Sequence, residues 1–446
     1  MTKVTATEQP TIVVIVGVTG DLSRRYLLPS LEKIARAGAL PKQFRVVGVT
    51  RQAIDVNEVL EGVKGETSFL RGNLDMCQVD LTELDEYKKL KDYLEDIEKE
   101  FSGTVQRLYY LSIPPQASQP VVRLLGESGL SKVEGTKLLL EKPFGVDLGS
   151  AEELLAYAEQ YFSEQQIYRI DHYLAKEMAQ NLLVFRDANP LLKHTWSKDF
   201  IERIEIVAHE SIDIEGRAGF YEQTGALRDV MQSHVLQLAA LTLMEPSVVG
   251  ASDVPAKRLA ALRSLRIPAD KPIPDSVLRG QYEDYRSEVE NDTSSVETYV
   301  QLDLSSSDPR WQGVPIRLST GKALAERKTA ITITYRSDSG LESNSLVLRV
   351  QPNAGIEFRL WAKAPGYEQK LVQHPLKFSY GDHYEELPEA YEQVLLDAIN
   401  SNHTLFTSSD EVRESWRIIQ PAQEYWDMHD DDLRFYAKGS VGPSRD

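Results

Sequence analysis

Several residues able to bind an anion stand together in residues 169–177, which read Arg-Ile-Asp-His-Tyr-Leu-Ala-Lys-Glu. If a helix begins near His172, then His172 and Lys176 lie four positions apart and share one face. Together with Tyr173, they could hold a phosphate monoester. Each residue taken alone could equally be an ordinary surface group, so the prediction of a phosphate site rests on their combination.

Two further residues could take part in proton transfer or ligand binding. Lys142 follows a short apolar run, so it should lie at the carboxyl end of a buried strand, where open α/β sheets bind ligands. His234 interrupts a strongly apolar helix predicted over residues 224–244, and we expect it to be at least partly buried. A buried histidine needs a partner or a task, and a satisfied core histidine is the ordinary alternative.

A glycine-containing turn follows the first predicted strand. Residues 17–22 read Gly-Val-Thr-Gly-Asp-Leu, and a helix is predicted directly after them. Gly17 allows a tight turn and Gly20 allows a pyrophosphate to approach the backbone, while the helix start offers N–H groups to the anion. The pattern is shorter than the usual Gly-x-Gly-x-x-Gly, so an ordinary strand-to-helix turn remains the alternative to dinucleotide binding.

The residue after the second predicted strand indicates which dinucleotide binds. NAD-dependent enzymes usually place an acid there to bond the ribose 2′-hydroxyl, whereas this chain has Arg51. A guanidinium pairs well with the 2′-phosphate of NADP. Arg51 could also be a solvated surface residue, and Asp55 could still serve as a ribose acid. NADP is therefore the favoured cofactor, with NAD possible as a secondary one.

The elements that must position these residues change in type along the chain. In the first part, continuous apolar strands alternate with helices, which predicts right-handed βαβ units and a doubly wound parallel sheet. The expected strands cover residues 11–17, 44–49, 107–113 and 136–140, and the expected helices include 22–37 and 82–101.

After about residue 200, strands follow one another without intervening helices, which predicts a mainly antiparallel sheet with packed helices. The fold class is therefore α/β followed by α+β, with a Rossmann-like dinucleotide-binding domain over 1–170 and a larger α+β domain over 171–446. The expected elements of the second part are strands at 201–208, 297–304, 314–319, 329–335, 345–350 and 355–361, and helices at 387–400 and 409–426.

The composition narrows the class of protein. Formal net charge is −18, which disfavours nucleic acid or an anionic membrane as a partner. Cys77 is the single cysteine, so no intrachain disulfide is expected. We find no apolar run of membrane-spanning length, no leader pattern in residues 1–10 and no metal-ligand spacing. The expectation is a soluble cytoplasmic protein without a metal.

In this order and spacing, the motifs resemble those of the glucose-6-phosphate dehydrogenase family. The resemblance spans almost the whole chain, and the motif at 169–177 is its most specific part. The matching segments begin at Gly17, Glu141, Arg169, Arg228, Gly321, Gln351, Tyr391 and Ser409.

The resemblance implies oxidation of D-glucose 6-phosphate at C1 to the δ-lactone with hydride transfer to NADP⁺, the first oxidative step of the pentose phosphate pathway. In that reaction His234 corresponds to the general base and Asp171 to the carboxylate that orients it. His172, Tyr173 and Lys176 correspond to the phosphate clamp. The other matched positions are Lys142, Glu210, Asp229, Lys322, Arg327 and Gln351 for the substrate, and Gly17, Thr19, Gly20, Asp21, Leu22, Arg51 and Lys142 for the cofactor.

Two departures from the family pattern qualify this transfer. Ala175 replaces the usual glycine and adds a methyl group beside the phosphate motif, and the chain is short between Arg51 and Leu108. Some members hold a second, structural NADP, to which Lys328 and Arg349 fit in part. The family also forms homodimers or homotetramers, which we expect here, and the resemblance implies that the domain over 171–446 binds substrate and mediates oligomerisation.

Two other functions remain open. Another NAD(P)-dependent sugar oxidoreductase of similar plan would use Lys142 as its acid or base, and would not need both the clamp and the Lys322/Arg327 pair. A non-catalytic homologue with a regulatory role should have lost His234 or the lysines, which are all present.

Overall fold

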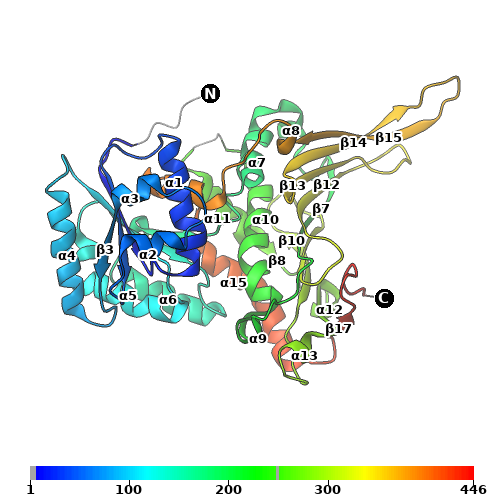
Figure 1. Ribbon diagram of the computed structural model, residues 1–446. Coiled ribbons are helices and arrows are strands. Elements are labelled where there is room, and N and C mark those ends of the chain that lie inside the picture. The colour runs from blue at the N-terminus through cyan, green and yellow to red at the C-terminus, as the bar shows by residue number, and fades with distance from the viewer. Residues whose placement is uncertain (1–6, 248–250, 446) are drawn as a thin grey trace. The chain divides into compact units, whose positions relative to one another are not determined.

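The computed structural model describes residues 7–247 and 251–445, and the chain divides into two compact units (Figure 1). The first unit comprises residues 1–145, 149–175 and 388–409, and the second comprises 146–148, 176–387 and 410–446. The division predicted from sequence, between residues 170 and 171, made each domain one continuous segment. The structure differs because residues 388–409 return to the first unit. The expectation of no leader pattern concerned residues 1–10, and residues 1–6 of that segment lie outside the described residues.

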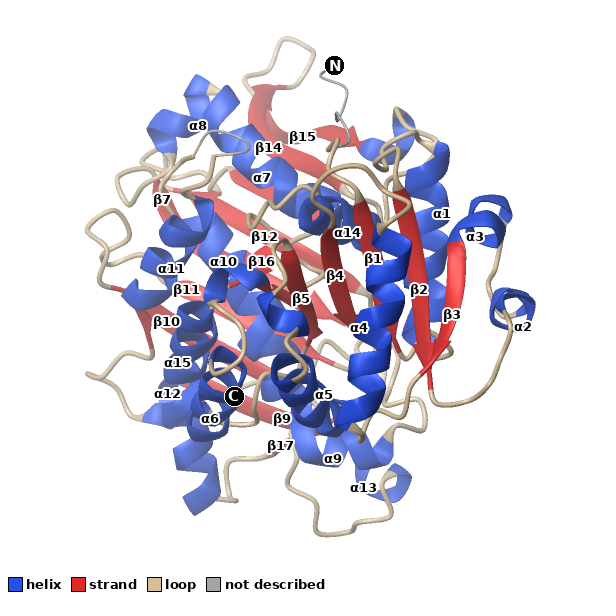
Figure 2. Cartoon of the chain, turned by 90° about the vertical axis from the view of Figure 1, so that its left-hand side faces the viewer, coloured by secondary structure: helices blue, strands red, loops and turns tan. Residues whose placement is uncertain are grey.

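The first unit is built on a mainly parallel sheet with the strand order β16-β6-β5-β4-β1-β2-β3 (Figure 2). Strand β1 is an inner strand, and the chain passes from it to β2 and β3 on one side before returning to β4 on the other. The predicted doubly wound sheet is thereby confirmed. Its strands are β1 (Thr11–Val16), β2 (Phe44–Thr50), β3 (Leu74–Gln78), β4 (Gln106–Leu111), β5 (Thr136–Glu141), β6 (Ile167–Ile170) and β16 (Phe406–Thr407).

Helices cover both faces of this sheet, because its inner strands are buried on both sides: β1 and β4 are buried throughout, and β5 is buried except at Glu141. Helices α4, α5 and α6 pack on the face to which Ile12 and Val14 point. Helix α14 packs against α1. The helices of this unit are η1 (Ser23–Leu27), α1 (Leu28–Arg36), α2 (Val56–Glu61), α3 (Ser68–Asn73), α4 (Leu84–Glu98), α5 (Pro115–Glu127), η2 (Leu130–Lys132), α6 (Leu148–Glu159), η3 (Glu164–Gln166) and α14 (Ala390–Ile399).

The second unit is built on a large mixed sheet with the order β15-β14-β13-β12-β7-β11-β10-β9-β17, and β8 pairs with β10. Most neighbours are antiparallel, as predicted, but β7 pairs with β11 and β9 with β17 in parallel. The strands are β7 (Ile201–His209), β8 (Leu265–Arg266), β9 (Val277–Tyr282), β10 (Tyr299–Ser306), β11 (Ile316–Gly321), β12 (Lys328–Tyr335), β13 (Ser345–Gln351), β14 (Gly355–Lys363), β15 (Leu371–Ser379) and β17 (Arg434–Tyr436).

One face of this sheet carries a buried helical layer. The helix predicted over 224–244 is interrupted at Gly225 and continues as η4 and α10. Residues of η4 pack against β7, β10 and β11. The helices are α7 (Glu177–Ala188), α8 (Pro190–Thr195), α9 (Ala218–Ala226), η4 (Leu227–Val235), α10 (Leu236–Leu243), α11 (Val254–Ser264), α12 (Ile273–Ser276), α13 (Tyr285–Glu288), η5 (Tyr380–Asp382) and α15 (Ser409–Met428).

Candidate active site

One edge of the parallel sheet collects most of the predicted site segments of the first unit. Strands β1, β2, β4, β5 and β6 all run in the same direction, so their carboxyl ends meet at this edge. The predicted turn follows β1, Arg51 follows β2, Lys142 follows β5 and Asp171 follows β6. Ligands of open α/β sheets bind at such an edge, next to the point where the strand order reverses.

The turn after β1 requires glycine at its first position. Gly17 has φ +86°, and a Cβ there would lie 2.4 Å from the carbonyl oxygen of Ser112. The Gly20 N–H donates to the Gly17 carbonyl at 2.9 Å, which closes the turn. Ser23 Oγ, at the start of the helix, donates to the same carbonyl at 3.1 Å. The turn leads directly into a helix, whose first N–H groups have no partner within it and can bind an anion.

Arg51 and Asp55, the two residues on which cofactor choice depended, have different surroundings. Arg51 is exposed directly after β2, and its carbonyl oxygen accepts from Gln78 Nε2 at 3.1 Å. Asp55 is the N-cap of α2, where its side chain accepts from the Glu58 N–H at 3.0 Å. Asp55 therefore has a local structural role, which leaves Arg51 better suited to meet a ribose phosphate.

Glu141, which sequence reasoning did not single out, precedes Lys142 and lies among tyrosines. Tyr110 Oη donates to its carboxylate at 2.5 Å, and Tyr391 of α14 also hydrogen-bonds to it. Burial raises the pKa of Glu141 to about 7, partly opposed by these hydrogen bonds and by Lys142. The end of β5 thus combines a lysine with a carboxyl group that titrates near neutral pH.

Asp171 and the two residues after it form a turn, which corrects one expectation. Asp171 Oδ1 accepts from the Tyr173 N–H at 2.9 Å, and its carbonyl accepts from the Leu174 N–H at 3.0 Å. The helix begins at Glu177, with Lys176 as its N-cap. The prediction that a helix begins near His172 is therefore wrong, because the Asp171 side chain bonds the backbone two residues on and stabilises a turn instead.

The turn surrounds His172 with aromatic rings rather than helix neighbours. The imidazole lies 5.1 Å from the Tyr173 ring, and it is nearly parallel to the Tyr391 ring at 6.2 Å between centroids. Tyr173 and Ala175 are buried, so the methyl group of Ala175 faces protein rather than solvent. Within the first unit, the structure brings Lys142, Asp171 and His172 to the ends of two adjacent strands, since Glu141 pairs with Ile170.

In the second unit, the predicted base lies within a buried helix. His234 is 3% exposed, which confirms the prediction of burial. It lies near the end of η4, the same helix that carries Asp229 in its first turn. Helix η4 packs on β7 and β11, the two strands that precede Glu210 and Lys322.

Glu210 and Lys322 meet at the ends of β7 and β11. The two strands are parallel, with His209 opposite Gly321, so the residue after each strand lies beside the other. Lys322 Nζ pairs with Glu210 Oε2 at 2.5 Å and lies 5.6 Å from the centroid of the Tyr221 ring. Lys322 is 2% exposed, which makes this a buried cation at the strand ends.

His209, the last residue of β7, directly precedes Glu210 and is neutral at physiological pH, because burial lowers its pKa to about 4, with Lys328 acting in the same direction. Its Nε2 lies 3.0 Å from Ser319 Oγ.

The remaining predicted substrate residues of this unit also form a group. Lys176 Nζ donates to Gln351 Oε1 at 2.6 Å, and Gln351 Nε2 donates to Thr329 Oγ1 at 3.2 Å. Arg327 is exposed directly before β12. Arg327, Lys328, Arg349 and Gln351 line one side of a cavity of about 410 Å³. Sequence positions far apart are thus collected where β12 begins and β13 ends.

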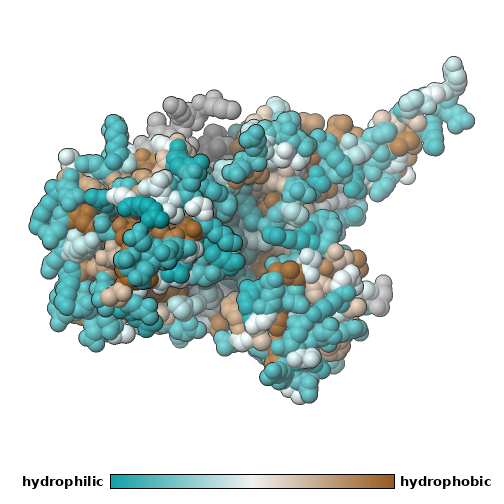
Figure 3. Space-filling model, viewed as in Figure 1, coloured by the Kyte–Doolittle hydropathy of each residue, from teal (hydrophilic) through white to brown (hydrophobic). Residues whose placement is uncertain are grey.

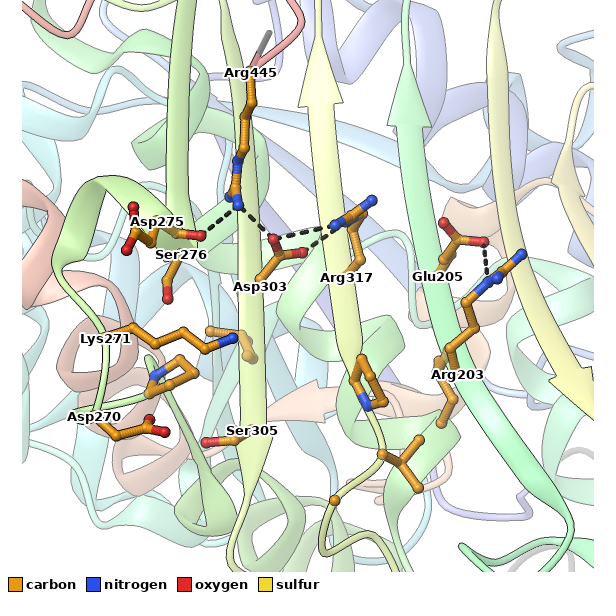
Figure 4. Close-up of a pocket in the computed structure, with 16 residues that line it drawn as sticks. Arg203, Glu205, Asp270, Lys271, Asp275, Ser276, Asp303, Ser305, Arg317 and Arg445 are labelled. Atoms are coloured by element: carbon orange, nitrogen blue, oxygen red, sulfur yellow. Dashed lines mark hydrogen bonds and ion pairs between the residues drawn. The ribbon is translucent and has the colours of Figure 1, made fainter. Parts of the chain in front are cut away.

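A larger cavity of the second unit does not involve the predicted site residues. It has a volume of about 840 Å³ and lies on the sheet face formed by β7, β10 and β11. Figure 4 shows Asp303 between Arg317 and Arg445, at 2.7 Å and 3.0 Å respectively, with Lys271 extending from the loop before α12. Cavity size alone therefore does not identify the site.

Among residues 7–247 and 251–445, no three His, Cys, Asp or Glu side chains are grouped so as to hold a metal ion. Within the same ranges, no helix is long and apolar enough to cross a bilayer.

Both halves of the chain match known families. Residues 14–181 match the family described as "Glucose-6-phosphate dehydrogenase, NAD binding domain", and residues 183–446 match "Glucose-6-phosphate dehydrogenase, C-terminal domain". The glucose-6-phosphate 1-dehydrogenase of Chlamydia muridarum is 33% identical, over 97% of this chain and 94% of that protein.

Two solved structures are similar to the whole chain. A glucose-6-phosphate dehydrogenase in complex with its substrate glucose 6-phosphate has a TM-score of 0.90 at 31% identity, covering 99% of this chain and 97% of that one. The glucose-6-phosphate 1-dehydrogenase of Mycobacterium avium has a TM-score of 0.82 at 31% identity, covering 97% and 96%.

Proposed function

The chain belongs to the glucose-6-phosphate dehydrogenase family, and we propose that it oxidises D-glucose 6-phosphate at C1 to 6-phospho-D-glucono-1,5-lactone. The observation that carries this proposal lies in the first unit. The segment that matches the family's substrate motif, residues 169–177, runs from the last two residues of β6 into the turn after it, and β6 lies beside β5, which ends just before Lys142. The groups proposed to bind substrate are thus carried by the same sheet edge as the predicted cofactor turn.

NADP is the cofactor that the chain's own residues fit best. The turn at Gly17 and Gly20 has no side chain at either glycine, and the following helix start offers N–H groups to a pyrophosphate. Thr19, Asp21 and Leu22 lie in the same turn and helix start, and Arg51 is the cation that would meet a 2′-phosphate. When bound, the cofactor would accept hydride at its nicotinamide ring. NAD, which lacks the 2′-phosphate, would be a poorer cofactor.

His234 would remove the proton from the C1 hydroxyl group as hydride leaves C1. An imidazole suits this task because it accepts a proton near neutral pH. Asp171 would hold the imidazole in the tautomer that leaves one nitrogen free, and would stabilise the imidazolium that forms. Asp171 is well suited to a fixed orientation, because its backbone and one carboxylate oxygen are already held in the turn after β6.

The phosphate and sugar would be held by the residues that match the family's substrate positions. His172, Tyr173 and Lys176 are proposed to bind the phosphate, with further contacts from Lys322, Arg327 and Gln351. Glu210 and Asp229 are proposed to bond sugar hydroxyls, and Lys142 to lie between sugar and cofactor. Binding energy from the phosphate, which does not react, would hold C1 in line for both transfers.

The proposal is tested by following absorbance at 340 nm with glucose 6-phosphate and NADP. Rapid reduction of NADP by glucose 6-phosphate, and not by glucose, is the expected result. Activity on a different sugar alone would favour another NAD(P)-dependent sugar oxidoreductase. Cofactor binding without any turnover would favour a non-catalytic homologue.

We also propose that the chain forms a homodimer or homotetramer through the sheet of the second unit. Strand β15 is at the edge of that sheet, and an unpaired edge is a template for pairing with another chain. The β14–β15 hairpin carries exposed hydrophobic residues among hydrophilic ones (Figure 3). Leu371, Leu376 and Phe378 are 47%, 61% and 37% exposed.

The cytoplasmic location expected from the sequence stays a prediction.

A further inference from the structure

The helix that carries His234 has an unusual beginning. Helix α9 is followed directly by η4, which begins at Leu227. The helical path is broken two residues before that, at Gly225, which has φ +62° and ψ −179°. The first N–H groups of a new helix lack partners within it and must be satisfied from elsewhere. The residue before it, Ala226, makes no side-chain cap.

Glu297, which lies just before β10, supplies those partners. Its Oε1 accepts from the Leu227 N–H at 2.9 Å, and its backbone carbonyl accepts from the Ala226 N–H at 2.9 Å. Glu297 is 7% exposed, and burial raises the pKa of its carboxyl, opposed by the Leu227 hydrogen bond and by Arg228 and Arg279. A carboxylate beside a helix N-terminus is also favoured by the helix dipole.

The space at Gly225 shows how closely this contact is fitted. A Cβ built on Gly225 would lie 2.4 Å from Glu297 Oε1 and 2.8 Å from its Cδ. Any side chain at this position would displace the carboxylate from the helix start. The positive φ of Gly225 also favours glycine over other residues.

Glu297 connects this helix start to a second part of the proposed site. The next residue, Thr298, accepts from the Lys322 N–H through its carbonyl at 2.9 Å and donates to the Gly280 carbonyl at 2.7 Å. One short segment therefore holds both the beginning of η4 and the backbone of Lys322. A shift of that segment would move the helix that carries Asp229 and His234 relative to Lys322.

From these contacts, and resting on the role proposed for His234, we propose that Glu297 is a positioning residue for catalysis. It does not touch the reacting atoms. It fixes the start of η4, and His234 lies about two turns further along the same helix. Small displacements of a catalytic group lower turnover strongly, by up to about 100-fold for 1 Å.

The test compares Glu297→Ala with Glu297→Gln in the full-length chain. The glutamine keeps an acceptor oxygen at the same place, so it should retain kcat for glucose 6-phosphate within about threefold. The alanine removes the acceptor and should lower kcat by roughly 10- to 100-fold. The Kd for NADP, measured by fluorescence without substrate, should not change in either variant, since Glu297 lies outside the nucleotide unit.

A matched control separates positioning from general stability. Glu32 is also a buried carboxylate that caps a helix from another element, accepting from the N–H groups of Phe69 and Leu70 at 3.1 Å. Glu32→Ala should lower Tm to a similar extent and leave kcat at saturating cofactor within about threefold. If Glu297→Ala lowers Tm as Glu32→Ala does but keeps its kcat, the proposal is wrong.

Hydrogen exchange gives a readout that needs no activity and no alanine variant. Glu297→Asp withdraws the carboxylate by one methylene group, so amide exchange over residues 227–243 should speed up relative to the rest of the second unit. Unchanged exchange there would overturn the positioning role. Failure of the unaltered chain to oxidise glucose 6-phosphate would instead overturn the proposed function.

Discussion

At the scale of single residues, the proposed base is the most informative. His234 is 3% exposed and lies near the end of η4, which continues into the fully buried helix α10. Burial of an imidazole is costly unless the group is bonded or used. Its position on a helix held at its start by Glu297 is consistent with a group whose placement matters.

His234→Asn should leave substrate and cofactor binding intact and lower kcat by roughly 10²–10⁴-fold, the usual contribution of a positioned base. Steady-state kinetics with glucose 6-phosphate and NADP give the measurement. His194→Asn, at an exposed histidine of α8, is the matched control and should leave kcat unchanged. Retention of more than about a tenth of kcat by His234→Asn would remove the residue from the mechanism.

Lys176→Ala tests the substrate class directly. A phosphate monoester is largely a dianion at neutral pH, and loss of a charged partner at a desolvated site costs about 2–5 kcal/mol. Binding of glucose 6-phosphate should weaken by roughly 30-fold or more, since about 1.4 kcal/mol is tenfold. The kcat/KM for unphosphorylated glucose should barely change, so the ratio between the two substrates should collapse.

The matched control is Lys193→Ala, which removes an exposed lysine paired with Asp187 at 3.0 Å. Lys176 also donates to Gln351, so a purely structural role is a real alternative. Parallel losses for glucose and glucose 6-phosphate would show that Lys176 holds β13 rather than the phosphate.

At the scale of elements, most of the proposed site residues lie directly after the carboxyl ends of strands. The turn proposed to bind the cofactor follows β1, and Arg51, Lys142 and Asp171 follow β2, β5 and β6, while Glu210 and Lys322 follow β7 and β11. Two parallel strands have their carboxyl ends at the same edge of the sheet, so residues that follow them lie close together even when they are distant in sequence.

Arg51→Ala should raise KM for NADP much more than KM for NAD, because only NADP carries the 2′-phosphate. Initial rates with both cofactors at saturating glucose 6-phosphate measure the effect. Arg36→Ala, which removes another exposed arginine of the same unit, should change neither constant. Equal effects of Arg51→Ala on both cofactors would identify Arg51 as a surface charge.

The end of α14 provides a test by pH. Burial raises the pKa of Asp397 to about 6, opposed by hydrogen bonds from Gln393 and Asn402. The folded state therefore binds this proton more tightly than the unfolded state does. The protonated carboxyl group of Asp397 therefore contributes to the stability of the fold at low pH, and this contribution is lost as pH rises from about 4 through about 6.

Asp397→Asn, which is uncharged and of the same shape, should stabilise the chain at pH 8 by up to about 3 kcal/mol and have little effect near pH 4. Urea midpoints at the two pH values measure this difference. Asp96→Asn, at an exposed residue of α4 paired with Lys99, is the control and should show no such trend. Destabilisation by Asp397→Asn at pH 8 would mean that the charged carboxylate is favourable.

At the scale of the whole molecule, the chain carries a net charge of −18 and yet is proposed to bind two phosphorylated ligands. Local groups of cations resolve this apparent conflict. Lys176, Lys322, Arg327, Lys328 and Arg349 all belong to the second unit, and Arg51 and Lys142 to the first. The general field would slow association at low ionic strength, whereas the local cations would decide affinity.

Assembly can be tested at the exposed edge of the large sheet. Leu376→Lys places a charge on β15, where the leucine is 61% exposed, and should shift the chain toward smaller species in analytical ultracentrifugation. Leu191→Lys, at a 68% exposed leucine of α8, is the control and should keep the distribution of the unaltered chain. An unchanged distribution in Leu376→Lys would place the interface elsewhere.

Much of this molecule could be predicted from the sequence because the signals are local. A continuous β-branched run such as residues 11–16 favours a buried strand wherever it occurs, and Gly17 marks the turn that follows. The strand-helix alternation, the buried His234 and the position of Lys142 after a strand follow from the same kind of pattern. Family motifs added the roles proposed for these residues.

Tertiary structure decided what depends on pairing between distant segments. Lys322 meets Glu210 across 112 positions because β7 and β11 are parallel and in register. Residues 388–409 return to the first unit, where they bring Tyr391 beside His172. Glu297 reaches the helix start at Leu227 from 70 positions away. No local pattern specifies these contacts, because strand register and long-range packing are set by the free energy of the whole fold.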